Sequence, residues 1–383
     1  MTPSRRSSLV ATLLISLSLL TDASPMGAAA PVGPVDPAIP VSVAPVVTTT
    51  EDLLGSAVDV LTGLGGALLD GGLVRTLDTA VAAASANPCS GSGPLKKSSN
   101  GSITVLLLGS DYRKKPYIGE RTDTVIAMNI ASNGRVSMAA IPRDTTRIRL
   151  AGGGTSGARR VNALYIGYKR GGVGPTRVDC SALDKLRRDV AKTLDTYIPY
   201  YALIRMDEFQ TLLDRIGGIK MNIKMTLIDY HYRANRRKIY VPASSDYQMN
   251  GGGNCGPKPK KCRSALRYAR SRYGTEGGTA NSDFRRVRRQ QQIVFYAIRR
   301  VLSRGSGSNL MDLLASAKGR IFTNLPKTTS GALTLYSAAQ GASFKTKDGV
   351  VFGPQRWASY TGRYTFQLKL HDVRQWVDSH FKP

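Results

Sequence analysis

Residues 103–113 read ITVLLLGSDYR, and this stretch decides the fold. Its first six residues are all apolar or β-branched, which is typical of a strand buried on both faces of a sheet. Gly109 ends the run. Asp111 follows at the point where a strand of an α/β protein usually meets its ligand crevice. We therefore expect a buried central strand with a carboxylate at its end.

Residues 119–144, GERTDTVIAMNIASNGRVSMAAIPRD, extend this pattern. They contain two β-rich runs, 124–130 and 136–141, separated by Ser-Asn-Gly at 132–134, which predicts an antiparallel hairpin. Strand and helix patterns alternate further along the chain, which favours a layered α/β protein. Because the hairpin makes the sheet mixed, we predict a layered α/β/α domain with a central mixed β-sheet.

The other expected elements follow from hydrophobic periodicity and from glycine and proline breaks. We expect a loop at about 230–262 and linkers at 31–50 and 85–100. We expect strands at 200–204 and 219–223, weak helices within 51–84, and helices at 183–194, 208–216, 263–272, 284–304, 309–318 and 331–340.

Residues 1–30 have the layout of a secretory signal. Arg5 and Arg6 precede an apolar-rich run at 9–20, and small residues follow it. The run is shorter than the roughly 20 residues that span a bilayer, so we expect a cleaved signal peptide, with an uncleaved anchor as the alternative. Residues 31–100 are expected to form a linker and a weakly helical extracytoplasmic segment, followed by the main domain at 101–383.

Four cysteines fit an exported protein, because disulfides persist in oxidising compartments. Cys255 and Cys262 bracket a short loop of Gly, Pro and Lys, which favours a local disulfide, and Cys89 with Cys180 would form the second bridge. A zinc site is disfavoured because the cysteines are not paired as CxxC and the chain has only three histidines.

The chain of 383 residues carries a formal net charge of +28, which implies an anionic partner such as nucleic acid, a phosphorylated lipid or an acidic polymer. Residues 1–100 contain five basic and seven acidic residues, so the whole excess lies in 101–383.

With 42% hydrophobic residues the chain is not wholly disordered. The sequence contains neither GxxxxGK[ST] nor GxSxG, which disfavours P-loop chemistry and Ser/His hydrolysis.

Acidic and basic side chains follow the ends of the predicted strands. Asp111 follows the first strand and Asp123 opens the next, and Mg²⁺ commonly binds one or two carboxylates together with substrate phosphates. We therefore predict a Mg²⁺ site, with Mn²⁺ as an alternative. A turn or a strand cap would explain either aspartate alone.

Arg143 and Asp144 follow the third strand, where Arg143 would project into the same crevice. A surface ion pair of little energetic value is the alternative.

Residues 263–304 form a strongly basic segment with eleven arginines and only two acids. Helical geometry, at about 100° per residue, places Arg286 and Gln290 beside the apolar stripe of the predicted helix. These two side chains should therefore point inward at the edge of the site. Arg285 and Arg288 lie on the opposite face and should face water.

In this order, the motifs resemble the LytR–CpsA–Psr family of cell-wall glycopolymer ligases. Each motif alone is weak, whereas the ordered set is specific and covers residues 101–325. Beyond the two stretches quoted above, the resemblance rests on RVNALYIGYKRGG, YYALIRMDEFQTLLDRIGGI, MNG, ALRYARSR and DFRRVRRQQQ. Arg285 departs from the family pattern, which usually has Gly there.

The resemblance implies an exported, Mg²⁺-dependent phosphotransferase with its catalytic domain at 101–383, acting at the membrane surface or near the cell wall. Such enzymes move a glycopolymer, for example teichoic acid or arabinogalactan, from a polyprenyl-pyrophosphate carrier to peptidoglycan. The acceptor is usually the 6-hydroxyl of N-acetylmuramic acid, and the product is a phosphodiester. The resemblance also implies an apolar tunnel for the polyprenyl chain and no nucleic-acid partner.

The family pattern also implies roles for individual residues. Asp111 and Asp123 would hold Mg²⁺ against the pyrophosphate, Asp283 would orient the arginines, and Asp144 is a candidate base or supporting residue. A metal with several arginines suits phosphoryl transfer, which needs charge neutralisation and alignment more than covalent chemistry. The phosphate-binding set would be Arg121, Arg143, Arg270, Arg272, Arg286 and Gln290, and the catalytic set Arg121, Arg143, Asp144 and Asp283.

Two alternative functions stay open at this point. The first is a polyprenyl-pyrophosphate pyrophosphatase, in which water replaces the acceptor hydroxyl. The second is a non-catalytic secreted protein that binds a polyanion. A binder of this kind should interleave basic residues with exposed aromatic side chains, whereas only Tyr268, Tyr273 and Phe284 lie within residues 263–292 of the basic segment.

Overall fold

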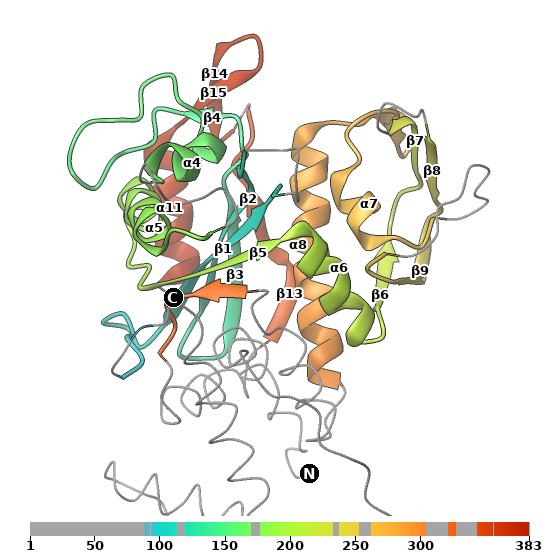
Figure 1. The fold of residues 1–383 in the computed structure, drawn as a ribbon, viewed down its shortest axis with the longest axis horizontal. Coiled ribbons are helices and arrows are strands. Elements are labelled where there is room, and N and C mark those ends of the chain that lie inside the picture. The colour runs from blue at the N-terminus through green and yellow to red at the C-terminus, as the bar shows by residue number, and fades with distance from the viewer. Residues whose placement is uncertain are drawn as a thin grey trace, which may run out of the picture.

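The computed structural model describes Cys89, Gly91 and residues 94–112, 119–169, 177–232, 237–252, 262–303, 321–326, 343–354 and 356–382. The predicted signal peptide, the weak helices within 51–84 and the helices expected at 309–318 and 331–340 lie outside these residues. Figure 1 shows the arrangement of the described elements.

A six-stranded mixed sheet forms the centre of the molecule, as predicted (Figure 1). β1 lies in its interior, antiparallel to β2 and parallel to β5, and the predicted hairpin is the β2–β3 pair. The two edge strands pair antiparallel with β5 and parallel with β3. In spatial order the strands are β12 (Ile321–Thr323), β5 (Tyr200–Arg205), β1 (Ile103–Ser110), β2 (Thr122–Ile130), β3 (Arg135–Ala140) and β13 (Ser343–Val351).

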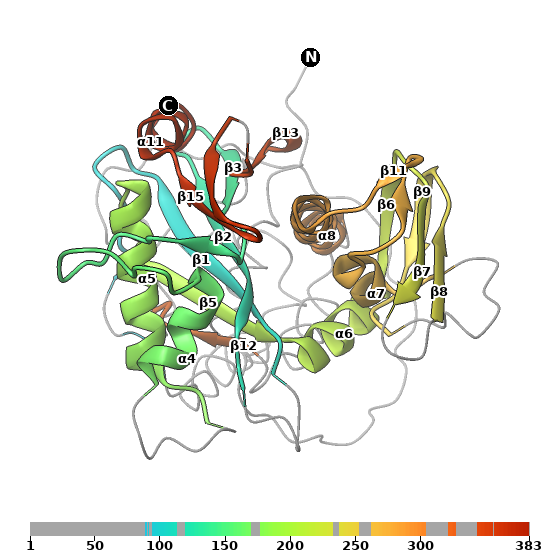
Figure 2. The same cartoon turned by 90° about the horizontal axis from the view of Figure 1, so that it is seen from above.

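Helices cover both faces of the central sheet, which confirms the predicted α/β/α layering (Figure 2). On one face lie α4 (Leu164–Tyr168), α5 (Cys180–Leu194) and α11 (Leu370–Phe381). On the other face lies α8 (Asp283–Ser303), accompanied by α6 (Met206–Arg215) and α7 (Ala265–Arg270).

Two hydrophobic clusters stabilise these layers. The first joins the central sheet to α5 and α11, and its fully buried members include Leu106, Val190 and Phe352. The second joins α7 and α8 to an outer group of strands, with Ile239 and Ile293 buried in it. Because α8 lies between the central sheet and these outer strands, it packs on two sides.

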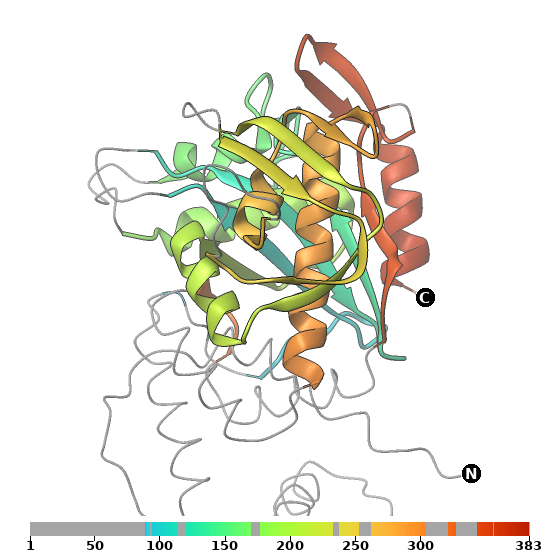
Figure 3. The ribbon, with the colours of Figure 1, turned by 90° about the vertical axis from the view of Figure 1, so that its right-hand side faces the viewer.

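The outer strands correct the prediction of a loop at 230–262, because much of that region is β-structure. Figure 3 looks onto these strands, with α8 behind them. One pair joins β6, which was predicted at 219–223, to β9, and the other strands form a four-stranded sheet in the order β11-β10-β7-β8. The elements are β6 (Ile219–Ile223), β7 (Leu227–Tyr232), β8 (Arg237–Val241), β9 (Ser244–Met249), β10 (Thr275–Glu276) and β11 (Thr279–Ala280).

Apart from β6, these outer strands escaped prediction, and only one of their faces is buried. In β8, Ile239 and Val241 are buried whereas Lys238 is exposed, so the apolar signal is carried by every second residue. The chain after residue 340 was assigned no element either. There the structure contains β13, α11, β14 (Ala358–Gly362) and β15 (Thr365–Leu368), and the last two form a small three-stranded sheet with β4 (Thr145–Thr146).

A disulfide joins Cys89 to Cys180, with the two Cα atoms 5.2 Å apart, which confirms that prediction. The bond attaches the segment before β1 to the first residue of α5. Cys262 is also disulfide-bonded, whereas Cys255, its predicted partner, lies outside the described residues.

No helix in the described part of the chain combines the length and the apolar composition needed to cross a membrane.

Candidate active site

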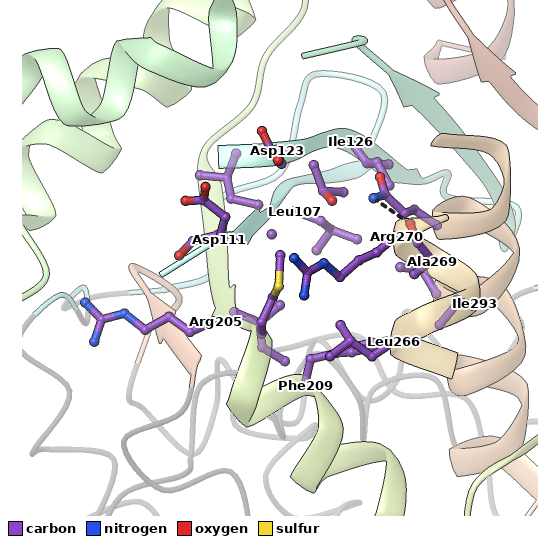
Figure 4. A pocket seen from close by; sticks show the side chains of 18 of the residues that line it. Leu107, Asp111, Asp123, Ile126, Arg205, Phe209, Leu266, Ala269, Arg270 and Ile293 are labelled. Carbon is purple, nitrogen blue, oxygen red and sulfur yellow. Dashed lines mark hydrogen bonds between the residues drawn. The ribbon is translucent and has the colours of Figure 1, made fainter. Parts of the chain in front are cut away.

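A cavity of about 400 Å³ lies between the central sheet and helices α6, α7 and α8 (Figure 4). Most of its wall is apolar, and it is contributed by strands on one side and helices on the other. One end is polar, and there Asp111 and Asp123 lie near each other while the guanidinium of Arg270 points into the cavity. The apolar wall includes Leu107, Ile126, Met128, Phe209, Leu266 and Ile293.

Gly109 brings the two strands that carry the aspartates close together. It pairs with Thr124 across β1 and β2, and a Cβ atom at residue 109 would lie 2.8 Å from Thr124 Oγ1 and 2.9 Å from Thr124 Cβ. Only glycine fits at that separation without a shift of the backbone. The register then changes immediately after Gly109, between β1 and the start of β2. This local geometry sets Asp111 and Asp123 at the same end of the cavity.

The Asp123 carboxylate is held from two sides. Its Oδ2 accepts a hydrogen bond from Arg143 Nη1 at 3.0 Å, and its Oδ1 accepts one from Asn162 Nδ2 at 2.9 Å. Burial alone raises the pKa of Asp123, but the positive charges of Arg143 and Arg286 and the two hydrogen bonds outweigh burial and lower it. Asp123 is therefore an ionised carboxylate at neutral pH.

Asp111 is held by the backbone of the strand that follows. Its Oδ1 accepts a hydrogen bond from the Arg121 backbone N at 2.7 Å, and its own backbone N donates to the Arg121 carbonyl at 3.0 Å. The Arg121 side chain is exposed and does not line the cavity. The sequence prediction gave Arg121 a phosphate-binding side chain, whereas in the structure its backbone is what contacts the site.

Asp283, the first residue of α8, joins three arginines from different parts of the chain. Its carboxylate oxygens lie 3.1 Å from Arg286 Nη2, 3.3 Å from Arg272 Nε and 3.6 Å from Arg143 Nε. Arg286 lies one turn further along α8, Arg272 follows α7 and Arg143 follows β3. The single carboxylate thus draws guanidinium groups from three segments to the polar end of the cavity.

Asp144 supports this group without lining the cavity. Its Oδ2 lies 3.4 Å from Arg143 Nε, and its Oδ1 lies 2.8 Å from Arg160 Nη1. These contacts make it a neighbour of Arg143, which lines the cavity, whereas Asp144 itself does not line it. The position fits the supporting role considered for Asp144 better than that of a base acting on a bound substrate.

Arg286 and Gln290 point inward, as the helical pattern predicts. Arg286 is 4% exposed, and Gln290 lines the cavity and donates from Nε2 to the Ala269 carbonyl at 3.3 Å. Burial lowers the pKa of Arg286 to about 10, with Asp283 opposing that shift, so Arg286 stays charged at neutral pH. Within the described part of the chain, Arg286 Nε is buried without a hydrogen-bond acceptor, so a bound anion would satisfy it.

The model of the LytR_cpsA_psr family matches residues 75–376. The chain belongs to the LytR_cpsA_psr family. The match begins before residue 101, so residues 75–100, which the sequence prediction left outside the resemblance, are part of the family region.

Named relatives of this LytR_cpsA_psr protein occur among curated proteins and solved structures. The polyisoprenyl-teichoic acid–peptidoglycan teichoic acid transferase TagV of Bacillus subtilis (strain 168) is 26% identical over 284 residues, which are 73% of this chain and 64% of TagV. TagU of Halalkalibacterium halodurans, which is also named a polyisoprenyl-teichoic acid–peptidoglycan teichoic acid transferase, is 28% identical over 50% of this chain and 51% of TagU. This chain therefore spans about half to two thirds of these relatives.

The crystal structure of B. subtilis TagV has a similar fold. It matches 74% of this chain and 99% of the TagV chain in the crystal, with a TM-score of 0.51 and 25% identity.

The described part of this LytR_cpsA_psr protein brings together Asp111, Asp123, Arg143, Arg270, Arg272, Arg286 and Gln290 around one cavity, with Asp283 bridging the arginines. Of the predicted site residues, only Arg121 and Asp144 have side chains away from these positions.

Several residues at the site were not predicted, and Arg205 is the most prominent. It lines the cavity and bonds Glu120 through Nε at 2.9 Å and Nη2 at 3.2 Å. Its guanidinium also lies 3.8 Å from the centre of the Tyr112 ring, and in Figure 4 it extends away from the middle of the cavity. Arg205 ends β5, the parallel neighbour of β1, so the rule that singled out Asp111 would also have found it.

The two cavity aspartates are too few to hold a metal ion by themselves. No group of three or more His, Cys, Asp or Glu that could hold a metal occurs among the residues that the structure describes. Two carboxylates with no nitrogen or sulfur ligand suit a hard cation such as Mg²⁺, whose coordination substrate phosphates and water complete. The donor set therefore fits Mg²⁺ in a complex with a phosphorylated substrate and does not fit a structural zinc ion.

Proposed function

We propose that this protein is an exported phosphotransferase that moves a glycopolymer from a polyprenyl-pyrophosphate carrier to peptidoglycan and forms a phosphodiester. The observation that carries the proposal is the continuity of the cavity, whose apolar wall leads to a polar end with Asp111, Asp123 and the arginines Arg143, Arg270, Arg272 and Arg286. The transferase activity for which TagV and TagU are named supports the same reaction class.

The apolar part of the cavity suits the polyprenyl chain. Its wall comes from β1, β2, β5, α6, α7 and α8, and residues such as Leu107, Phe209 and Ile293 offer no hydrogen bonds to a ligand. A hydrocarbon chain gains roughly 25 cal/mol for each Å² of apolar surface that it buries. We therefore assign the lipid of the carrier to this region, with its pyrophosphate at the polar end.

The polar end suits a pyrophosphate. Arg143, Arg270, Arg272 and Arg286 present guanidinium groups there, and the planar donor fork of arginine matches phosphate oxygens. Asp283 spaces three of these cations and offsets part of their mutual repulsion. Arg286 Nε, which is buried without an acceptor in the described part of the chain, would donate to a phosphate oxygen.

In the proposed reaction, the acceptor hydroxyl of peptidoglycan attacks the phosphorus that carries the glycan. The new O–P bond forms as the bridging P–O bond of the pyrophosphate breaks, the glycan phosphate becomes a phosphodiester, polyprenyl phosphate leaves and the hydroxyl proton passes to solvent. Mg²⁺, held by Asp111 and Asp123, would neutralise charge on the phosphate oxygens. Arg143 and Arg286 stabilise the charge on the departing phosphate, and Asp144 orients Arg143.

We further propose that the protein acts outside the cytoplasm at the membrane surface. The Cys89–Cys180 disulfide supports an oxidising compartment. A lipid-linked substrate requires access to the membrane, and the excess of basic residues favours contact with anionic lipid headgroups.

The direct test is turnover of a polyprenyl-pyrophosphate-linked glycan with peptidoglycan oligomers, with and without Mg²⁺. Wild-type protein should form a glycan–peptidoglycan phosphodiester, and Asp123→Ala and Arg286→Ala should lose most of this activity while retaining the fold by circular dichroism. Turnover at the wild-type rate by both variants would refute the proposed site. Release of a free phosphorylated glycan without transfer would instead identify a pyrophosphatase.

A further inference from the structure

The segment that carries Arg270 and Arg272 needs support from outside its own helix. α7 has only six residues and ends at Arg270, and Arg272 lies beyond it. A helix this short has little stability of its own, and its last carbonyls have no partners within it. Since both arginines face the cavity, whatever holds this segment also decides where their guanidinium groups lie.

Arg289 of α8 holds the backbone segment that leads from α7 to Arg272. It is 1% exposed and was not singled out by any sequence pattern. Its Nε donates to the Tyr268 carbonyl at 3.0 Å, and its Nη2 donates to the Ser271 carbonyl at 2.5 Å. These two carbonyls flank Arg270 in the chain, so one guanidinium bridges the turn that leads from α7 to Arg272.

The remaining donor group of Arg289 is fixed by residues that follow the turn. Nη1 donates to Glu276 Oε2 at 2.5 Å and to Asn281 Oδ1 at 3.1 Å. Glu276 is itself buried, so the pair is a desolvated ion pair that is stable only while both charges and their hydrogen bonds are satisfied. The orientation of the guanidinium plane is therefore fixed by Glu276 and Asn281.

A buried carboxylate holds the same turn from the opposite side. Asp229 of β7 is 0% exposed and accepts from Ser271 Oγ at 2.5 Å and from the Tyr273 backbone N at 3.3 Å. The turn therefore lies between the Arg289 guanidinium and the Asp229 carboxylate. An apolar residue in place of Arg289 would fill space equally well but would leave both carbonyls unbonded.

We propose that Arg289 is a positioning residue, which orients the guanidinium groups of Arg270 and Arg272 toward the phosphates of the substrate by holding the backbone of 268–271. This inference rests on the proposed function, because it assigns these arginines to a pyrophosphate. Arg289 does not line the cavity itself. Lysine is a poor replacement because its single ammonium group cannot span the two carbonyls and Glu276 together.

The first experiment measures binding of inorganic pyrophosphate to the full chain by calorimetry in the presence of Mg²⁺. Arg289→Lys keeps the charge and loses the planar fork, and it should weaken binding about tenfold, equivalent to about 1.4 kcal/mol. Arg288→Lys is the matched control, because Arg288 is the adjacent, exposed residue of α8, and its affinity should stay within about twofold of wild type. Wild-type affinity in Arg289→Lys would overturn the proposal.

The second experiment separates positioning from general destabilisation. In a chain that already carries Arg270→Met and Arg272→Met, adding Arg289→Lys should change pyrophosphate affinity by less than about twofold, because residues that act together are not additive. A further tenfold loss in that background would show that Arg289 acts elsewhere. If Arg289→Lys does not fold, Glu276→Gln keeps an acceptor for Nη1, and it should give about a threefold loss with the same dependence on background.

The third experiment has no functional readout. Hydrogen–deuterium exchange of the backbone amides at 271–273 should become about tenfold faster in Arg289→Lys, whereas exchange in β1 and β2 should stay at the wild-type rate. Unchanged exchange at 271–273, or equally faster exchange throughout the central sheet, would contradict the proposal. If wild-type protein binds pyrophosphate but transfers no glycan, the proposed transfer fails while the positioning role can still be measured.

Discussion

Asp283 Oδ2 lies 3.1 Å from Arg286 Nη2, one turn apart on α8, at the polar end of the cavity. The pair is largely desolvated, because Arg286 is 4% exposed. The other oxygen of Asp283 faces Arg143 and Arg272. The carboxylate therefore determines the spacing of three cations, and the site should depend strongly on its charge.

Replacing Asp283 with Asn tests that dependence. The amide keeps the size of the side chain but removes the negative charge, so the three arginines repel one another without compensation. We expect kcat/KM for glycan transfer to fall by about 30-fold or more, in line with the loss of charge-assisted hydrogen bonds. Steady-state kinetics measure this effect, and Asp378→Asn, an exposed carboxylate on α11, is the control. Wild-type kinetics in Asp283→Asn would contradict the role of Asp283.

The exposed side chain of Arg121 leads to the opposite expectation. Since only its backbone bonds Asp111, Arg121→Ala should lower kcat/KM by less than about threefold, as expected of a surface substitution. Arg143→Ala should lower it by at least about 100-fold, because that change leaves the buried Asp123 without its main counter-charge. Transfer kinetics of the two variants, measured side by side, decide between the structure and the sequence prediction for Arg121. A loss in Arg121→Ala as large as that in Arg143→Ala would favour the sequence prediction.

The ionisation of Asp123 predicts a pH dependence. Burial raises its pKa, but the charges of Arg143 and Arg286 outweigh burial, so the folded-state pKa lies below the ordinary 3.8. A depressed folded-state pKa stabilises the fold above the unfolded value, and that contribution is lost as the pH falls through the folded value. Arg143→Met should therefore raise the pKa of Asp123, measured by carboxyl NMR.

The same variant should move the acid limb of Mg²⁺-dependent pyrophosphate binding to higher pH. Arg147→Met, at an exposed arginine near Arg143 in sequence, provides a matched loss of one positive charge and should leave the acid limb in place. An acid limb that stays at its wild-type pH in Arg143→Met would separate Asp123 from cation binding.

The apolar wall predicts selectivity for lipid length. Ala297 lines the cavity from α8, and Ala297→Phe should fill part of the space that we assign to the polyprenyl chain. KM for a long-chain carrier should rise about tenfold, whereas KM for a short-chain analogue should change by less than about twofold, since a loss of this size corresponds to about two buried methylene groups. Ala297→Ser controls for the substitution itself. An equal change in KM for both substrates would argue against a lipid in this cavity.

The disulfide between Cys89 and Cys180 predicts a stability effect. It closes a loop with a sequence separation of 91 residues, and removing such a bond typically costs about 2–5 kcal/mol. The double variant Cys89→Ser/Cys180→Ser should have a free energy of unfolding lower by that amount, with a steeper slope of free energy against urea because its unfolded chain is less constrained. A free energy of unfolding within about 0.5 kcal/mol of wild type would mean that the bond adds little.

The sequence predicted the central sheet and most of the site because both lie on strongly patterned segments. The apolar run that ends at Gly109 and the hairpin after it fix the positions of Asp111, Asp123 and Arg143. The helical stripe also identified Arg286 and Gln290 correctly. These are the residues for which local pattern and tertiary contact agree.

The prediction failed where α8 departs from the usual one-sided helix. An amphipathic interpretation assumes one buried face, but α8 lies between two β-layers, and its buried residues include Arg286, Val287, Arg289, Gln291 and Ile293. Arg285, expected in water, is half-buried and donates to the Glu276 carbonyl at 2.7 Å. Arg289, the most deeply buried arginine of the described residues, was therefore given no role by the helical pattern.

The attachment of Cys89 to α5 has a mechanical consequence. Tension on the chain before Cys89 passes through the disulfide into α5, which packs on the face of the central sheet away from the cavity. β1, whose end carries Asp111, is thereby shielded from that load. A load applied to the chain before Cys89 would therefore reach the fold on the side away from Asp111 and Asp123.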